Sequence, residues 1–349
     1  MRGAALQRRR VAVTVVAIAA LVLSLLLHIS TRPGGLEPDL ALVVVARHLG
    51  APLELPPTLS ARAHLVDAII WSLRVPRALL AALVGAALGV AGGLTQGLFR
   101  NPMAEPGVIG VSAGAAAAAI LGFTLGLDGY GLWVTPALAA AGALGVMALL
   151  LALVDIRAGT TTLLLAGIAI AAMCSSLSTL LLALVAERWD LGLKVVRWLM
   201  GSFEGRSWEH LAGGVAPITL GLVFALWLGR DLDTMQLGDD TARSLGVRTG
   251  RFRQLVILCT AVLVGAATAV CGVIGFVGLV VPHIVRLLVG PGHRRLLPLS
   301  ALLGASLVVL VDTAARAVTR FSLPPGVVTS LLGAPFFLWL LRRRSGSGV

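Results

Sequence analysis

Apolar residues fill ten long runs of this chain, and short polar or glycine- and proline-rich stretches separate them. Because a helix of roughly 20 apolar residues crosses a bilayer, we predict that each run is a membrane-spanning helix. The predicted spans are 11–29, 78–98, 107–127, 132–154, 161–185, 211–229, 255–273, 276–288, 296–314 and 327–341. The fold class is therefore predicted to be all-α, a polytopic membrane protein with about ten transmembrane helices.

Two pairs of similar segments indicate an inverted internal repeat. "VGAALGVAG" from Val84 resembles "VGAATAVCG" from Val264, and "GTTTLLLAG" from Gly159 resembles "GVVTSLLGA" from Gly326. With ten spans the copies begin on opposite sides of the membrane, as in many transporters; chance similarity between helices rich in Gly and Ala is the alternative. We predict one transmembrane domain over 1–349, divided into a first span with an outer segment (1–77), a first repeat half (78–185), an outer loop, sixth span and cytoplasmic segment (186–254) and a second repeat half (255–349).

Charged residues are few and mostly basic: they make up 13% of the chain, and the net charge is +12. The basic residues lie in short loops beside apolar runs, which is typical of membrane topology, so we expect no nucleic-acid partner. Of the 28 Lys and Arg residues, the ten-span topology places 17 on the inner side and 11 on the outer side. The positive-inside rule then puts both termini in the cytoplasm. The positive-inside rule does not explain the 11 basic residues on the outer side.

A short capped helix is predicted between Gly238 and Gly246, in the most charged part of the chain. Asp239 and Asp240 would complement the positive end of its dipole, and Arg243 lies one turn further on. This pattern suits a helix shown to another protein. It also describes any well-capped surface helix, so the residues alone leave both interpretations open.

Arginines gather at the predicted outer side of two spans. Arg74 and Arg77 lie three residues apart at the start of the second span, and Asp312, Arg316 and Arg320 share one helical face near the end of the ninth. The structural interpretation is an ion pair between Asp312 and Arg316, with the other side chains extending to the interface. The functional interpretation is a basic surface that receives an acidic partner.

Small residues repeat along the second span in a regular pattern. Gly85, Gly89, Gly93 and Gly97 recur every fourth residue and leave one narrow strip of backbone bare. Such strips allow helices in a membrane to approach closely, so we predict that these four glycines pack against another helix.

Hydroxyl side chains mark the fifth span. Thr160, Thr161 and Thr162 open it, and Ser175 and Ser176 lie near its middle. Hydroxyls of this kind can bond back to helix carbonyls, which is the structural interpretation. The functional interpretation is a weakly polar pathway wall with a threonine gate at its inner end.

The sequence lacks the residues that a membrane enzyme or an ion-coupled transporter would need. It has no GxxxxGK[ST] motif, no cluster of His or Cys at metal-ligand spacing, and only Arg100 and Glu105 in the turn-rich inner loop after the second span. The first eight spans carry acids only at their ends, at Asp128 and Asp155. We therefore expect a transport subunit that is not itself an enzyme, that contains no metal or cofactor, and whose ATP, if used, is hydrolysed by another chain.

Seven segments together resemble the FecCD-type permease subunits of ABC importers for iron-siderophores, haem and cobalamin. They are "RVPRALLAALVGAALGVAG" from Arg74, "LFRNPMAEPGVIGVSAGA" from Leu98, "LLLAGIAI" from Leu163, "QLGDDTARSLGV" from Gln236, "GVIGFVGLVVPHIVRLL" from Gly272, "HRRLLPLSALLGASLVVLVDTAAR" from His293 and "GVVTSLLGAPFFLWLL" from Gly326. The segments occur in the family's order over nearly the whole chain.

The resemblance implies a pathway between two permeases, as a homodimer or with a paralogue, in the bacterial inner membrane and in contact with membrane lipid. Its other partners would be two cytoplasmic ATPases, which bind ATP and Mg, and a periplasmic substrate-binding protein. Arg74, Arg77 and Arg316 match arginines that receive glutamates of the binding protein, and Thr160 and Thr161 match the inner gate in residue type. The matched ATPase-coupling residues are Leu237, Gly238, Asp239, Asp240, Ala242, Arg243, Leu245 and Gly246.

The chain departs from the family's pattern before the last span. "FSLPPGVVT" places Ser322 where the family usually has an acid, and Pro325 beside Pro324. We expect the outer entrance to the tenth span to be stiffer and less acidic. The expected cargo is a ferric siderophore or a related chelate, with haem or cobalamin as the alternative and an ATP-independent secondary transporter as a third hypothesis.

Overall fold

The computed structural model describes residues 2–32, 35–53, 63–155, 159–185, 187–318 and 323–345, and these are almost entirely helical. The elements are α1 (Arg2–Ser30), β1 (Thr31–Arg32), β2 (Gly35–Leu36), α2 (Pro38–His48), α3 (Ala63–Ala68), the π-helix η2 (Ile69–Arg74), α4 (Val75–Leu98), the 3-10 helix η3 (Pro106–Ile109), α5 (Val111–Thr124), the 3-10 helix η4 (Leu127–Tyr130), α6 (Val134–Leu153), α7 (Thr160–Leu184), α8 (Trp189–Leu199), α9 (Trp208–Met235), α10 (Asp239–Ser244), α11 (Thr249–Cys271), α12 (Val277–Val289), α13 (His293–Val318) and α14 (Pro325–Ser345). The two short strands pair antiparallel, Thr31 with Leu36. The predicted all-α class is confirmed.

Seven helices of the described residues are long and apolar enough to cross a membrane. They span Arg9–Ser30, His64–Leu98, Val134–Leu153, Thr160–Leu184, Trp208–Met235, Thr249–Cys271 and His293–Ala317. The apolar helices α5, α12 and Pro325–Leu340 of α14 are shorter. All ten predicted segments are thus helical, but three fall short of a full span. The count of ten crossings and the inverted repeat remain predictions.

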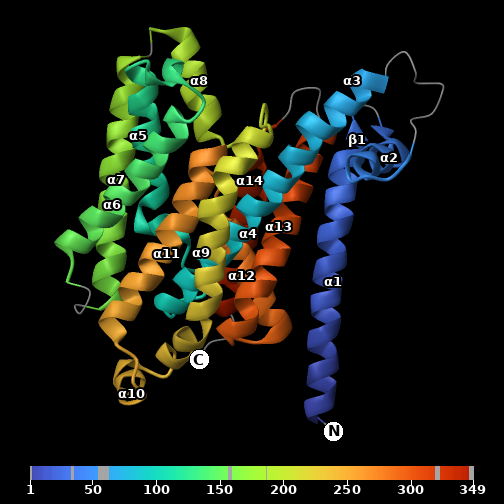
Figure 1. The fold of residues 1–349 in the computed structure, drawn as a ribbon. Coiled ribbons are helices and arrows are strands. Elements are labelled where there is room, and N and C mark those ends of the chain that lie inside the picture. Colours follow the sequence, from blue (N-terminus) through green and yellow to red (C-terminus); the bar gives the residue numbers. More distant parts are fainter. Residues whose placement is uncertain are drawn as a thin grey trace.

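The long helices lie side by side and place the charged features of the chain at opposite ends (Figure 1). Both termini and α10 lie at one end, which we call the inner end. The helices α3 and α8 lie at the other, the outer end, where the sequence also predicted non-spanning outer segments. The helix α10 therefore lies at the opposite end of the bundle from α3 and α8.

The helix α4 is central and is buried along nearly its whole length. Its glycine strip faces α13: a Cβ on Gly85 would collide with the Gly304 carbonyl, and one on Gly89 with the Ser300 carbonyl. Further down the strip, Gly93 meets Leu297, and Gly97 meets His293. The bare backbone on this face explains how two helices come close enough to fix their relative position.

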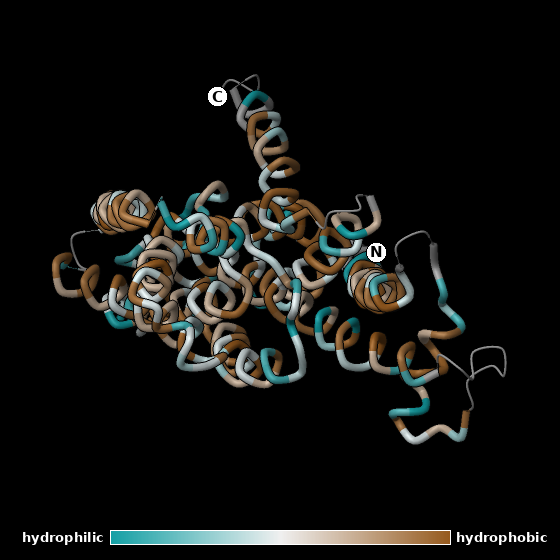
Figure 2. Tube along the Cα trace, turned by 90° about the horizontal axis from the view of Figure 1, so that it is seen from above, coloured by the Kyte–Doolittle hydropathy of each residue, from teal (hydrophilic) through white to brown (hydrophobic). Residues whose placement is uncertain are grey.

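Wide apolar faces of α1, α7 and α14 are uncovered. Exposed side chains include Val15 and Leu23 of α1, Met173 of α7, and Leu331 and Leu338 of α14. Seen from above, α14 extends away from the bundle and carries the C-terminus at its far end (Figure 2). Apolar surface of this extent suits contact with lipid acyl chains or with another membrane chain.

Candidate functional site

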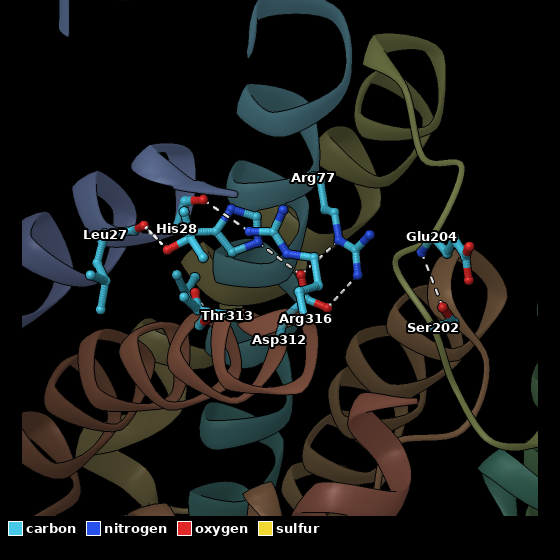
Figure 3. A network of polar contacts seen from close by, with 10 residues as sticks. Leu27, His28, Arg77, Ser202, Glu204, Asp312, Thr313 and Arg316 are labelled. Atoms are coloured by element: carbon cyan, nitrogen blue, oxygen red, sulfur yellow. Dashed lines mark hydrogen bonds and ion pairs between the residues drawn. The ribbon is translucent and has the colours of Figure 1, made fainter. Parts of the chain in front are cut away.

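A buried carboxylate organises the charges at the outer end. Asp312 of α13 is fully buried and accepts two bonds from Arg77 of α4, from Nε at 2.7 Å and from Nη2 at 2.7 Å. His28 Nε2 of α1 lies 2.8 Å from the same carboxylate (Figure 3). A two-bond Arg–carboxylate pair is among the strongest polar contacts in proteins. Asp312 thereby ties α1, α4 and α13 together.

The other two outer arginines bind the end of α1. Arg74 Nη1 donates to the Ile29 carbonyl at 3.1 Å, and Arg316 Nη2 donates to the His28 carbonyl at 2.9 Å. The last carbonyls of a helix have no partner within it and carry partial negative charge, so guanidiniums stabilise this end. We call His28, Arg74, Arg77, Asp312 and Arg316 the outer charge network.

This geometry changes the expectation for Asp312 and leaves the docking prediction open. The carboxylate pairs with Arg77 and His28, and not with Arg316 as the structural interpretation supposed. Arg77 is only 13% exposed. With three guanidiniums and one carboxylate, the outer charge network itself nevertheless carries net positive charge. Arg320 and Ser322 lie outside the described residues, and Pro325 begins α14.

At the inner end, α10 forms as the short helix that the sequence predicted. Gly238 precedes it with φ 106° and Gly246 follows it with φ 89°, conformations that glycine adopts without strain. Inside the helix, Ala242 is fully buried and holds its inner face against the bundle. We call residues 237–246 the coupling segment, after the role predicted for it.

Asp239 anchors the coupling segment to two other parts of the chain. Arg100, in the loop after α4, donates to Oδ1 at 2.6 Å, and Arg253 of α11 donates to Oδ2. Partial burial alone would raise the pKa of this carboxyl, but the Arg253 and Arg100 guanidiniums hold the pKa of Asp239 below its usual value. The carboxylate is therefore charged at neutral pH and clamped from both sides.

The remaining charged residues of the coupling segment face outward. The side chain of Asp240 is 96% exposed and that of Arg243 is 62% exposed, and the two form an i,i+3 pair at 3.1 Å. Leu237 and Leu245, on either side of the helix, are 64% and 61% exposed. The structure thus divides the predicted coupling residues into an anchoring set and an outward-facing set.

Contacts that the sequence did not reveal fix the helix leading into the coupling segment. Arg100 Nη2 also donates to the Met235 carbonyl at 2.6 Å, and Gln236 Nε2 donates to the Gly97 carbonyl at 2.8 Å. The inner loop with Arg100 offered no reaction chemistry, and its role here is structural. The only signal in the sequence was an arginine in a turn-rich loop, with nothing to identify its partner.

The hydroxyls of α7 lie on a helix that the bundle covers only in part. Thr161, Thr162, Ser175 and Ser176 are exposed, and Thr160 is half-buried at the inner start of the helix. Nearby, Thr179 bonds back to the Ser175 carbonyl at 3.0 Å, as the structural interpretation requires. Hydroxyls on an open, otherwise apolar face also suit a pathway wall, so the gate stays a prediction.

Long apolar helices that lie side by side with open apolar faces are typical of a multi-pass membrane protein. The chain belongs to the FecCD transport family, which matches residues 20–343. It is 45% identical over 302 residues to the vitamin B12 import system permease protein BtuC of Vibrio cholerae, covering 82% of this chain and 87% of that protein. It is 38% identical over 286 residues to the uncharacterised ABC transporter permease YvrB of Bacillus subtilis, covering 80% of each.

A solved structure shares the fold over its full length. It is an ABC transporter assigned to the metal-chelate type, in an inward-facing conformation, with a TM-score of 0.81 and 30% identity. The match covers 97% of this chain and 99% of that one. The protein is therefore a permease subunit of an ABC importer, and the resemblance drawn from its motifs is confirmed.

Proposed function

We propose that this chain forms half of the translocation pathway of an ATP-driven importer for a metal chelate. In this proposal it lies in a bacterial inner membrane with both termini in the cytoplasm, beside two ATPases, a periplasmic binding protein and a second permease copy or paralogue. The observation that carries the proposal is α10: a short charged helix, anchored on one side and open on the other, at the same end as both termini (Figure 1).

The two sets of coupling residues suggest how force enters the bundle. An ATPase cleft would grip the outward set, Leu237, Asp240, Arg243 and Leu245, when nucleotide binding closes the ATPase pair. Asp239 cannot move far without drawing Arg100 and Arg253, which lie on the loop after α4 and on α11. Movement of the coupling segment would thus be transmitted through Arg100 and Arg253 to α4 and α11.

The pathway itself would lie between two permeases, along α7 and α14. Both helices have open apolar faces, and α7 adds exposed hydroxyls. A wall of this kind offers cargo few strong contacts, so binding is weak and release is easy. Selectivity then belongs mainly to the binding protein. Thr160, Thr161 and Thr162 at the inner start of α7 would form the gate.

At the outer end, the net positive charge of the outer charge network would receive an acidic binding protein. Arg74 and Arg316 would do so through the positive charge of their guanidiniums. Arg77 would contribute mainly by holding Asp312, because its guanidinium faces that carboxylate through two bonds. The outer excess of positive charge then has a use.

The cargo is proposed to be a ferric siderophore or a related chelate, with cobalamin as the second candidate. The second candidate is supported by the similarity to the Vibrio cholerae permease, whose name gives vitamin B12 as its cargo. A binding screen of the cognate binding protein against ferric siderophores, haem and cobalamin would separate them. The compound that stabilises the binding protein against heat should also be the one imported.

The decisive test is uptake by vesicles that contain this permease, its ATPases and its binding protein. We expect cargo to accumulate inside the vesicles only when ATP is enclosed with the ATPases inside and the binding protein is added outside. Uptake driven by an ion gradient without the ATPases would contradict the proposal and favour a secondary transporter.

A further inference from the structure

A basic hollow at the inner end is not used by the coupling segment. It has a volume of about 630 Å³, and Arg10 of α1 and Arg294 and Arg295 of α13 contribute to its wall. Val289, the last residue of α12, and Pro291, in the turn before α13, line it as well. Two helices far apart in the sequence therefore bring three arginines to the wall of one space.

The charge of this hollow is positive and largely uncompensated. Among the residues that the structure describes, Arg10, Arg294 and Arg295 form no ion pair. The one acid in the wall, Asp233, accepts bonds from the backbone N–H of His293 at 2.6 Å and from its ring Nδ1 at 2.8 Å. Three arginines against one carboxylate leave the wall with net positive charge, which suits an anion with several acceptor oxygens.

The position of the hollow indicates where such an anion comes from. Arg10 lies at the start of the membrane-crossing part of α1, Arg9–Ser30. Val11 and Val15, on the next turns of this helix, are 59% and 58% exposed and suit contact with acyl chains. Arg10 therefore lies at the membrane boundary of α1, and exposed apolar side chains of the same helix begin at the next residue.

We infer that this hollow binds the phosphate headgroup of an anionic phospholipid of the inner leaflet. The arginines take the phosphate, and the acyl chains lie along the exposed face of α1. Basic pockets between membrane helices at the cytoplasmic side are suited to such headgroups. A soluble phosphate would use the arginines but not the apolar surface beside them. An ATPase is expected at α10, whose outward residues belong to a separate part of the inner end.

The test compares lipid retention by the full-length permease and its variants. The protein is purified from vesicles with equal amounts of phosphatidylglycerol and phosphatidylcholine, and retained lipids are counted by native mass spectrometry. We expect wild type to retain phosphatidylglycerol in preference. The preference should fall about fivefold in Arg10→Gln and about fivefold in Arg295→Gln. In the double variant Arg294→Gln with Arg295→Gln the two losses should multiply, to about 25-fold.

Arg342→Gln is the matched control, because Arg342 is an exposed arginine of α14 outside the hollow. It should change the preference by less than about twofold, whereas an equal loss would show only a general effect of charge. Gel filtration and thermal unfolding would confirm that each variant is folded.

Three other outcomes would overturn the inference. The first is no preference of wild type for phosphatidylglycerol. The second is displacement of the retained lipid by inorganic phosphate at the lipid's own concentration, which would assign the site to a soluble anion. The third is loss of ATPase assembly in Arg295→Gln with lipid retention unchanged, which would assign the arginines to a protein partner.

Discussion

The two ends of this permease use arginine and aspartate in opposite ways. At the outer end, Asp312 is fully buried and held by Arg77 and His28, so its charge joins three helices. At the inner end, Asp240 and Arg243 are mostly exposed and bond only loosely within one helical turn. Asp312 and Arg77 therefore hold helices together at the outer end, whereas Asp240 and Arg243 remain exposed at the inner end.

Asp239 lies between these extremes and shows why burial decides the role. Its side chain is 27% exposed, yet two arginines from other elements clamp it. An exposed ion pair contributes little to stability, while a buried charge that loses its partner is costly. The loss of stability on breaking a pair should therefore be largest for the most buried pair and smallest for the most exposed one.

The largest effect is expected from Arg77→Ala. This substitution leaves the Asp312 carboxylate buried without its two-bond partner, and should reduce the free energy of unfolding by about 3 to 5 kcal/mol. Unfolding by sodium dodecyl sulfate in mixed micelles measures it. Arg342→Ala, an exposed control, should change stability by less than about 0.5 kcal/mol.

A second variant separates lost pairing from lost packing. Arg77→Met with Asp312→Asn removes both charges while keeping similar volume, and should recover most of the loss, because a buried pair is often replaceable as a unit. If the double variant is as unstable as Arg77→Ala, the side chain of Arg77 matters through its packing and the comparison between the two ends weakens.

An intermediate effect is expected from Asp239→Asn. The amide keeps the shape but loses charge at both arginine bonds, so unfolding should become easier by about 1 to 3 kcal/mol. The coupling segment should also become more accessible to proteolysis. ATP hydrolysis in the reconstituted importer should continue while uptake falls, because the segment no longer draws α4 and α11 with it.

The same variant gives a pH test. The folded-state pKa of Asp239 is below the ordinary value of 3.8. Its ionised form is therefore favoured by folding, and the stabilisation is present above pH 3.8 and is lost as pH falls through the lower, folded-state pKa. The stability difference between wild type and Asp239→Asn should shrink below about pH 4. A difference that is constant down to low pH would contradict the role assigned to the carboxylate.

A smaller effect is expected from Arg74→Gln. One bond to the Ile29 carbonyl is weakened, so stability should fall by about 1 kcal/mol. Affinity for the binding protein should fall too, more at low than at high ionic strength, since salt screens exposed charge. Equal affinity at every salt concentration would place the docking surface elsewhere. The control is Arg47→Gln, an exposed arginine of α2 outside the network.

The sequence predicted the elements well but only part of the contacts between them. Periodic apolar runs and the glycines at 238 and 246 depend on local chemistry, so the helices and α10 could be placed. The choice of Arg77 over Arg316 as the partner of Asp312 depends on how α4 and α13 pack, over a separation of 235 residues. Helical spacing favoured Arg316, four positions away, but tertiary geometry decided for Arg77.

The smallest effect on stability, and the sharpest test of function, is expected from Asp240→Lys with Arg243→Glu. Both side chains point outward, and the exchange keeps an opposite-charge pair at the same spacing, so stability should change by less than about 0.5 kcal/mol. An ATPase cleft that reads these charges would meet them reversed, and uptake in vesicles should be lost although ATP is still hydrolysed. Transport at the wild-type rate would show that the cleft recognises only Leu237, Leu245 and the backbone. The exposed pair of Asp240 and Arg243 would then have no role in recognition.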